Sequence, residues 1–318
     1  MPKYYETLPI KDMEPGMDVE GFFLLGPANV KTTNSGSPFL SFKVSDKTGE
    51  VDAKMWDYHS DIHEHPGAVV KIRGSVGSYN GAKQIVAERM RLAEPSDGYN
   101  LSELVPCAPI DVDSTYSRLV DVLNTIQDDT YRAIALRALV RYGEAFKTIP
   151  AGRSMHHSFL NGLLMHTYNV VMLALAVGEI YGQLIDIDLL VTGAFCHDMG
   201  KRKEFVISEI GLVSEYSIPG NLLGHLVMGA QEIVDIAREL NLDENSEKVL
   251  LLQHMLLSHH GEPEFGAAVP PKCLEAEILS RLDMLDAKVE MYREIAEKTE
   301  PGKMSDFARG FNRAVYIH

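Results

Sequence analysis

The spacing of apolar residues changes once along this chain, from a period of two to a period near 3.6. In residues 1–93 apolar and polar residues alternate in short segments, as Leu40, Phe42 and Val44 do with Ser41 and Lys43. From residue 115 onward, apolar residues recur at i, i+3, i+4 and i+7. Strands place successive side chains on opposite faces, whereas an amphipathic helix buries one stripe. The pattern therefore predicts a multi-domain α+β protein, with a β domain followed by an all-α helical bundle.

Five short strands are predicted in the first part, at residues 19–25, 39–45, 50–56, 68–75 and 84–91. They are rich in β-branched and aromatic residues, and turn sequences separate them. One of these turns, Asn80-Gly81, is typical of a two-residue hairpin. Five strands within about 75 residues fit a small closed barrel of the OB type.

An OB barrel binds single strands through aromatic side chains and a basic groove. We expect Lys54, Arg73 and Tyr79 to contact nucleic acid. The phenylalanines Phe22 and Phe42 are expected in the barrel core instead, because core packing is the commoner role of an aromatic residue in a strand.

The prolines of residues 94–113 and their lack of periodicity predict a linker. We place a barrel domain at 1–95, a linker at 96–114 and a helical domain at 115–318. Residues 205–221 break the helical pattern and predict a β-hairpin inserted between helices. The helices themselves are expected at 115–127, 129–147, 159–181, 186–199, 222–240, 246–259, 272–298 and 303–312.

The composition, 45% apolar and 24% charged residues in 318, is that of an ordinary globular protein. No apolar run approaches the roughly 20 residues of a membrane span. The start, MPKYYETLPIKD, lacks the apolar core of a signal peptide. Three widely spaced cysteines argue against a disulfide framework. We therefore expect a cytoplasmic protein without membrane contact, and the oligomeric state stays open between a monomer and a homo-oligomer.

The net charge of −15 is concentrated in the second part of the chain. Residues 1–95 carry 11 Lys and Arg against 13 Asp and Glu, whereas residues 96–318 carry 19 against 32. Because phosphate contacts dominate non-specific nucleic-acid binding, this balance argues against broad wrapping of a duplex. It leaves room for a small binding module, or for a metal site whose own charge holds phosphates.

Histidines and aspartates stand in or beside the apolar helical segments of the second part. Neutral imidazole and carboxylate are ligands of divalent metals such as Zn, Fe, Mn, Co and Ni. A helical bundle can direct such side chains from several helices into one interior site. The candidate metal ligands are His166, the adjacent pair His197-Asp198, His225, the pair His259-His260, and Asp283.

Asp198 is the most informative of these residues. It lies at the C-terminal end of a helical segment, where the macrodipole disfavours a carboxylate, and this favours a ligand role. Its two oxygens allow it to bridge two metal ions. Lys201 follows directly and is placed to meet a phosphate oxygen near the metals. His157 is a further catalytic candidate, as a substrate contact or a support for a ligand, with a structural role as the alternative.

Two choices among the ligands stay open at this point. Asp283 and Asp286 are three residues apart on one helix, so at least one carboxylate points toward packed surface, where a metal would offset its cost. Only one of His259 and His260 needs to bind metal, and the other can orient it or contact substrate.

The order of these residues resembles the H…HD…D pattern of HD-domain phosphohydrolases, and the extra histidines resemble the ligands of subfamilies that hold two metals. Four longer segments resemble one subgroup, the YhaM-type 3′-to-5′ exoribonucleases: MHHSFLNGLLMHTYNV from Met155, GNLLGHLVMG, LSHHGEPEFGAAVPP and EAEILSRLDMLDAK. PFLSFKVSDKTGEVDAKMWD resembles the OB fold that precedes the HD domain in that subgroup. Asn161 departs from the motif, which usually has Gly at that position.

The resemblance implies an enzyme that shortens single-stranded RNA, or DNA, from its 3′ end and releases nucleoside 5′-monophosphates, with Mn²⁺ or a related ion. Two alternatives stay open: an HD phosphohydrolase acting on a small cyclic nucleotide, and an inactive nucleic-acid-binding regulator. Fold alone does not decide the substrate. The implied ligands form two groups bridged by Asp198, with His166, His197 and Asp283 on one ion and His225 with His259 or His260 on the other.

Overall fold

The computed structural model describes residues 5–153 and 157–318. The chain divides into two compact units, Met1–Pro106 and Cys107–His318. The first unit consists of strands and the second of helices, so the predicted order of a β domain and a helical domain is confirmed.

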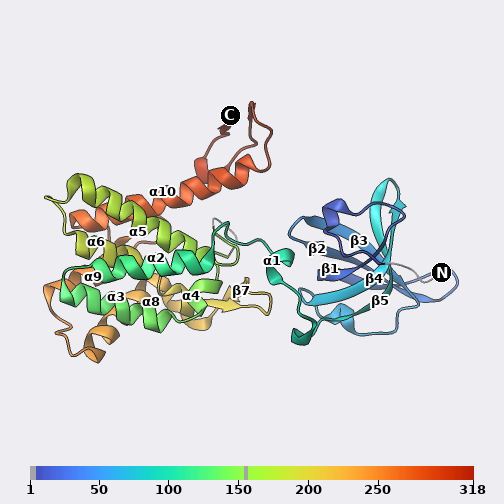
Figure 1. Cartoon of the computed structure of the whole chain (residues 1–318), viewed down its shortest axis with the longest axis horizontal. Helices are drawn as coiled ribbons and strands as arrows, with labels where there is room; N and C mark the ends of the chain where they lie inside the picture. The colour runs from blue at the N-terminus through green and yellow to red at the C-terminus, as the bar shows by residue number, and fades with distance from the viewer. Residues whose placement is uncertain (1–4, 154–156) are drawn as a thin grey trace. The chain divides into compact units, whose positions relative to one another are not determined.

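The first unit is a five-stranded closed barrel, as predicted (Figure 1). Its order is β1-β2-β3-β5-β4, and the parallel pairing of β3 with β5 completes the closure between otherwise antiparallel neighbours. The five strands fall on the predicted segments, although β1 continues well past residue 25 and β4 past residue 75: β1 (Asp18–Thr32), β2 (Pro38–Asp46), β3 (Gly49–Trp56), β4 (Val69–Tyr79) and β5 (Ala82–Leu92).

Alternation along the strands decides which aromatic residues fill the barrel. Phe42 is buried as predicted, together with the neighbouring inward positions Leu40 and Val44. The prediction for Phe22 is wrong: Phe23 takes the inward position of β1, and Phe22 lies on the outer face. A shift of one residue along a strand moves a side chain to the opposite face, and the apolar run around Phe22 gives no alternation that would fix the choice.

The segment predicted as a linker is shared between the two units. A short helix, α1 (Leu101–Leu104), packs against β1 and β2, with Leu104 and Val105 buried. The backbone N–H of Lys47 donates to the carbonyl of Glu103 at 3.1 Å. The structure therefore places the boundary after Pro106, inside the range 96–114.

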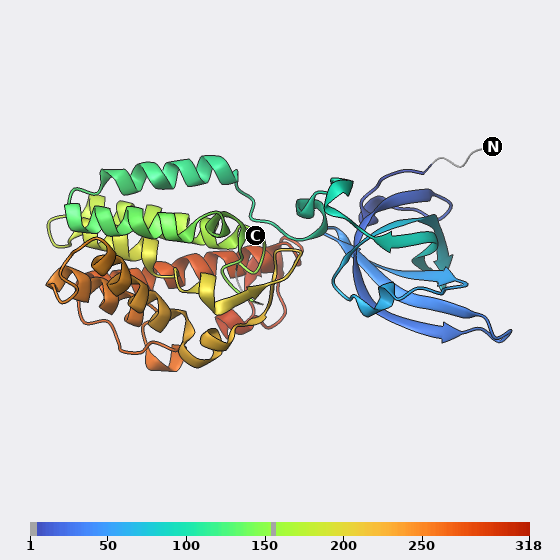
Figure 2. The same ribbon diagram turned by 90° about the horizontal axis from the view of Figure 1, so that it is seen from below.

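The second unit is a helical bundle whose helices agree with most of the predicted ranges (Figures 1 and 2). The predicted hairpin is present as β6 (Phe205–Ile207) and β7 (Val213–Tyr216). The helices are α2 (Val112–Thr125), α3 (Asp129–Tyr142), α4 (Ala145–Thr148), α5 (Gly162–Tyr181), α6 (Ile187–Cys196), α7 (Lys201–Glu204), α8 (Ile218–Glu239), α9 (Glu247–Ser258) and α10 (Leu274–Ala296).

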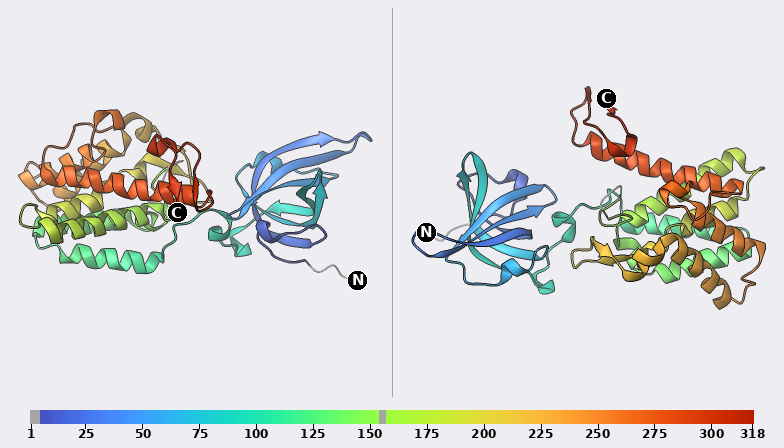
Figure 3. Two further views of the ribbon diagram at one scale, coloured as in Figure 1. Left: turned by 90° about the horizontal axis from the view of Figure 1, so that it is seen from above. Right: turned by 180° about the vertical axis from the view of Figure 1, so that it is seen from behind.

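The predicted helix at 303–312 is wrong. Beyond α10 the chain forms two short paired strands, β8 (Lys303–Met304) and β9 (Tyr316–Ile317), with a single 3-10 turn between them (Figure 3). The backbone of Gly302 and of Asn312 has positive φ, of 84° and 51°, which a right-handed helix does not allow.

Helix α6 is the centre of the bundle and presents the site. It packs against α3, α5, α9 and α10, and every residue from Leu189 to Cys196 is buried. A short helix that is apolar on all sides is stable only inside a core. Because α6 ends in the interior, the turn that follows it carries His197 and Asp198 into a buried position.

Helix α5 is long and apolar enough to cross a membrane by length and composition, contrary to the expectation that no apolar run reaches this length. Its N-terminal half is buried within the bundle, from Gly162 to Val171 except for two half-buried positions. We therefore assign α5 to the core of the helical unit.

The backbone conformation of Asn161, the residue directly before α5, explains why this position can depart from the usual Gly. This asparagine has a left-handed backbone, with φ of 64°, and its side-chain amide donates to the carbonyl of Lys147 at 2.6 Å. Glycine adopts this conformation freely, and asparagine tolerates it better than most residues. The substitution therefore preserves the start of the helix that carries His166.

Candidate metal centre

All seven predicted metal ligands meet in one interior site of the helical unit. Most are buried, and Asp283 and His260 are half-buried. They come from five places in the chain that are far apart in sequence: His166 from α5, His197 and Asp198 from the turn after α6, His225 from α8, His259 and His260 from the end of α9, and Asp283 from α10.

The two oxygens of Asp198 face different groups of imidazoles. Oδ2 is 3.5 Å from Nε2 of His166 and 3.4 Å from Nε2 of His197. Oδ1 is 3.5 Å from Nε2 of His225 and 3.8 Å from Nε2 of His259. Two ligand atoms bound at about 2.1 Å to one tetrahedral ion lie about 3.4 Å apart, so these separations fit ligand atoms that share a metal. Asp198 therefore stands between two groups of imidazole ligands.

Hydrogen bonds to Nδ1 fix the tautomer of two of these histidines. Nδ1 of His197 lies 2.7 Å from the carbonyl of Ala194, and Nδ1 of His259 lies 2.8 Å from the carbonyl of Leu256. A carbonyl only accepts, so each Nδ1 carries the proton. In the neutral ring Nε2 then keeps its lone pair and is the metal-binding atom.

Several polar atoms at the centre lack a hydrogen-bond partner among the residues that the structure describes. They are Oδ1 of Asp198, Nε2 of His225, Nε2 of His259 and Nδ1 of His260. Buried polar atoms without partners are costly, and a bound cation accounts for lone pairs of this kind. The ligand atoms of His225, His259 and His260 also lie within 4.8 Å of one another. The donor set therefore fits a divalent metal site.

A carboxylate that was not among the predicted ligands supports His166 from behind. Oδ2 of Asp286 is 2.7 Å from Nδ1 of His166 and 2.8 Å from Nε2 of His157. The side-chain amide of Asn169 donates to Oδ1 of the same aspartate at 2.9 Å. Three donors therefore converge on one buried carboxylate, which fixes the ring of His166 so that Nε2 faces Asp198.

This arrangement favours one of the roles left open for His157, that of a support for a ligand. The side chain is completely buried and bonds to Asp286, so it stands behind His166 and has no access to substrate. Its neighbours Met155 and His156, which belong to the motif noted in the sequence, lie outside the described residues.

The close approach of these charged and titratable groups shifts their pKa values in the metal-free protein. Burial alone would lower the pKa of His166, but Asp283 and Asp286 outweigh burial and raise it to about 10. Burial would raise the pKa of Asp198, whereas Lys201 and His197 hold it well below its usual value. A metal that binds Nε2 of His166 must therefore displace a proton.

Lys201 lies beside the centre, as predicted. Its ammonium group is 2.7 Å from Oδ2 of Asp198, and the opposite charge of Asp198 raises the pKa of Lys201 against the effect of burial. The side chain therefore brings a fixed positive charge to the edge of the cluster.

Local backbone features allow His225 to approach Asp198. Gly224, with φ of 73°, kinks α8 just before His225, and both N and Nδ1 of His225 lie 3.0 Å from Oε1 of Glu204. A Cβ on Gly200 would come within 2.2 Å of the carbonyl of His225. Gly200 is therefore required for close packing against α8, and its φ is that of an ordinary helix.

Sequence reasoning missed Glu204 and Asn169 and left Asp286 without a role. The spacing of Asp286 from Asp283 gave a partial signal, because both were expected near one helix face. Glu204 gave no signal in the sequence, since it ends the charged run KRKE, which is typical of a solvated turn.

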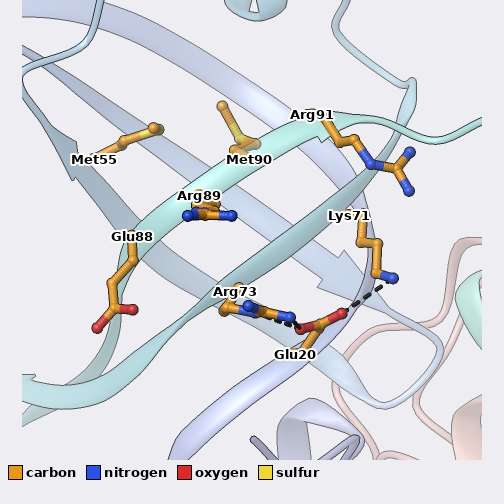
Figure 4. A pocket seen from close by; sticks show the side chains of 8 residues that line it. All are labelled: Glu20, Met55, Lys71, Arg73, Glu88, Arg89, Met90 and Arg91. Carbon is orange, nitrogen blue, oxygen red and sulfur yellow. Dashed lines mark hydrogen bonds and ion pairs between the residues drawn. The ribbon is translucent and has the colours of Figure 1, made fainter. Parts of the chain in front are cut away.

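On the barrel, the structure brings together two of the three predicted nucleic-acid contacts. The ammonium of Lys54 lies 4.5 Å from the ring centre of Tyr79 and 5.7 Å from that of Trp56. Both rings are at least half exposed. Arg73 lies elsewhere, on the outer face of β4, where it pairs with Glu20 (Figure 4).

The comparisons with known families agree with both units. An HD domain matches residues 163–288, and an OB-fold nucleic acid binding domain matches residues 28–93. Together with the cluster around Asp198, these matches define a metal-dependent HD-domain phosphohydrolase that carries an N-terminal nucleic-acid-binding barrel.

Curated relatives narrow the class further. The 3′-5′ exoribonuclease YhaM of Listeria welshimeri is 36% identical over 309 residues, which are 96% of this chain and 96% of the relative. The protein of the same name from Bacillus subtilis is 35% identical over 308 residues, 95% of this chain and 96% of the relative. This chain belongs to the YhaM 3′-5′ exoribonuclease family.

Proposed function

We propose that this protein is a metal-dependent 3′-to-5′ exoribonuclease that shortens single-stranded RNA and releases nucleoside 5′-monophosphates. The observation that carries the proposal is the position of Asp198, whose two oxygens face two separate groups of imidazoles. Two-metal sites of this kind serve in-line displacement at phosphorus. The barrel in the same chain favours a polymer over a small nucleotide, because OB folds bind extended single strands.

We further propose that the centre holds two ions, Mn²⁺ before Fe, Co, Ni or Zn. When bound, such ions lower the pKa of a water molecule and offset charge on the attacked phosphate and on the leaving oxygen. Asp198 would hold both ions, and the remaining ligands would divide into His166, His197 and Asp283 for one ion and His225, His259 and His260 for the other.

The protein's own residues orient this chemistry. Asp286 keeps Nε2 of His166 directed at Asp198, and Glu204 does the same for His225. Lys201 supplies a positive charge at Asp198, where its ammonium can stabilise the charge that develops on a phosphate oxygen. The burial of the cluster strengthens each of these interactions by excluding water.

Incubation of the protein with 5′-labelled single-stranded RNA and Mn²⁺ is expected to give a ladder of products shortened from the 3′ end. With 3′-labelled RNA, labelled mononucleotide should appear at once. Chelation of the metal with EDTA should stop the reaction, and excess Mn²⁺ should restore it. Gel electrophoresis and chromatography of the released nucleotides measure these outcomes.

The same assay decides among the alternatives. Hydrolysis of a cyclic dinucleotide with no shortening of RNA would replace the exonuclease by a small-nucleotide phosphodiesterase. Binding of RNA with no hydrolysis in any of the five metals would indicate an inactive regulator.

We propose that bases stack on the exposed aromatic surface of the barrel formed by Phe39, Lys54, Trp56 and Tyr79. The rings of Phe39 and Trp56 are 5.0 Å apart on neighbouring strands β2 and β3. In OB folds this face and the β4–β5 loop contact single strands. Stacking of one base contributes about 1–3 kcal/mol.

Trp56→Ala is therefore expected to weaken binding of single-stranded RNA by about 1–3 kcal/mol, measured by fluorescence anisotropy in EDTA. Hydrolysis of a small phosphodiester that needs only the metal centre should stay unchanged. Phe307→Ala removes an even more exposed ring from the helical unit and serves as the control. Equal affinities of all three proteins would exclude this surface.

We also propose that the protein acts in the cytoplasm. The proposal rests on the small, odd number of widely spaced cysteines, which is typical of reducing compartments. Fractionation of cells that express the protein tests it, and recovery in the membrane or secreted fraction would overturn it.

A further inference from the structure

A β-bulge in β5 creates a second charged surface on the barrel. Gly74 of β4 pairs with Ala87, but the preceding residue of β4, Arg73, pairs with Arg89 instead of Glu88. Glu88 is therefore an extra residue, and it shifts the register of everything that follows. A Cβ at Gly74 would lie 2.2 Å from the carbonyl of Val86, so the glycine is required where the strands approach at the bulge.

The shifted register places like charges opposite each other. Arg73 faces Arg89, and two residues along the strands Lys71 faces Arg91. A ladder without the bulge would have set Arg73 against Glu88, an attractive pair. Like charges directly opposite on neighbouring strands destabilise a sheet. The fold thus contains an arrangement that its own stability disfavours, and bulges of this kind commonly redirect side chains at functional sites.

Internal ion pairs compensate only part of this charge. Glu20 pairs with both Lys71 and Arg73, and Asp97 pairs with Arg91. The bulged Glu88 accepts a hydrogen bond from the hydroxyl of Tyr5. The exposed guanidinium of Arg89 has no ion pair with any residue in the ranges 5–153 and 157–318.

The four cations line a hollow of about 450 Å³ together with the carboxylates Glu20 and Glu88 and the methionines Met55 and Met90, so cations outnumber carboxylates there (Figure 4). A second hollow of about 390 Å³ on the same strands is lined by Tyr5, Phe22, Lys71 and Arg73. The ammonium of Lys71 lies 5.4 Å from the ring centre of Phe22. Cations interleaved with accessible aromatic rings are typical of surfaces that follow a single strand.

This surface is distinct from the aromatic one. Arg73 and Tyr79 lie on the same strand, six positions apart, which corresponds to about 20 Å. One nucleotide cannot reach both, whereas a strand of several nucleotides can.

We propose that the outer face of β1, β4 and β5, defined by Lys71, Arg73, Arg89 and Arg91, is a second binding site for the phosphate backbone of single-stranded RNA. The inference rests on the proposed function and extends it, because it assigns the strand a path along the barrel beyond the stacking surface. Arg89 makes the direct phosphate contact. The carboxylate of Glu20, on β1, holds the side chains of Lys71 and Arg73 in place.

The test compares the wild type with Arg89→Ala and Arg89→Glu, as full-length proteins in EDTA. The probe is a fluorescein-labelled oligouridine of about 20 nucleotides, longer than the site of one OB barrel. We expect Arg89→Ala to weaken binding about threefold to tenfold, and Arg89→Glu to weaken it further. The slope of log K against log salt should fall by about 0.7 for the lost phosphate contact.

The thermal stability of the two Arg89 variants should not fall with their affinity for RNA. Removing Arg89 relieves its repulsion with Arg73, and Arg89→Glu converts the repulsive pair into an attractive one, so the thermal midpoint should be unchanged or higher in both variants. A purely structural role for Arg89 predicts the reverse, a lower midpoint with the salt slope retained. Arg118→Ala removes an exposed arginine from α2 and is the control.

Two outcomes separate this inference from the function it rests on. If the wild type binds the oligouridine and Arg89→Ala binds it with the same affinity and salt slope, the second site is wrong and the exonuclease proposal stands. If the wild type neither binds nor shortens RNA, the proposed function itself fails.

Discussion

Replacement of Asp198 by asparagine is expected to abolish RNA hydrolysis, with a fall in kcat of about 10⁴-fold or more. Among the described residues, Asp198 is the side chain whose oxygens face both groups of imidazoles, so its loss would remove a ligand from each of the two proposed ions. An asparagine offers one oxygen and a neutral amide, which leaves Lys201 without its charge partner. Metal analysis of the variant after incubation with Mn²⁺ should show fewer ions per chain than the wild type.

Two comparisons make this result specific. Asp121→Asn, on an exposed position of α2, should retain both metal and activity. His225→Ala removes a donor from one group only, so it should lose one ion and keep the other. Retention of full activity by Asp198→Asn would remove Asp198 from the centre of the mechanism.

Asp286→Asn is expected to weaken metal binding about 10-fold to 100-fold, although Asp286 stands behind a ligand. Its carboxylate accepts hydrogen bonds from His166, His157 and Asn169. An asparagine has one accepting oxygen, so its amide must face either the two imidazoles or the amide of Asn169, which are donors. Nε2 of His166 then loses its fixed direction.

Titration with Mn²⁺ separates this role from direct ligation. A positioning residue predicts that saturating metal restores most of kcat in Asp286→Asn, with the loss confined to metal affinity. Asp283→Asn, which removes the donor 3.2 Å from Nε2 of His166, should stay impaired at every metal concentration. If both variants respond alike to metal, Asp286 is itself a ligand.

Much of the fold could be predicted because its signals are local. The five strands followed from alternation and turn residues, and the candidate metal ligands from the residue types at apolar helical positions. Phe22 could not be placed, because a run of four apolar residues in β1 contains no alternation and only the pairing with β4 decides which face is inside. The segment 303–312 failed for a similar reason, since its helical spacing competes with the left-handed backbone of Asn312.

The residues that meet in the candidate site were singled out from the sequence, whereas the residues that support them were not. His166, His197 and Asp198 carry an intrinsic signal, because polar residues in apolar helices need a reason to be buried. Glu204 carries none, since it resembles a solvated residue until α8 packs against it. Asn169 is a polar residue of the apolar helix α5, but its role depends on Asp286, which lies 117 residues away. The role of His157 stayed open between a substrate contact, a support and a structural residue for the same reason, because its partner Asp286 lies 129 residues away.

The sequence by itself determined which side chains can bind metal and that a barrel precedes a helical bundle, because periodicity and ligand chemistry are properties of local segments. Only the tertiary structure decided which oxygen of Asp198 faces which histidines, which carboxylate orients His166, and that Arg73 faces Arg89 across a bulge. These facts depend on the distance and register between segments far apart in the chain. Packing fixes such distances, and no local pattern encodes them.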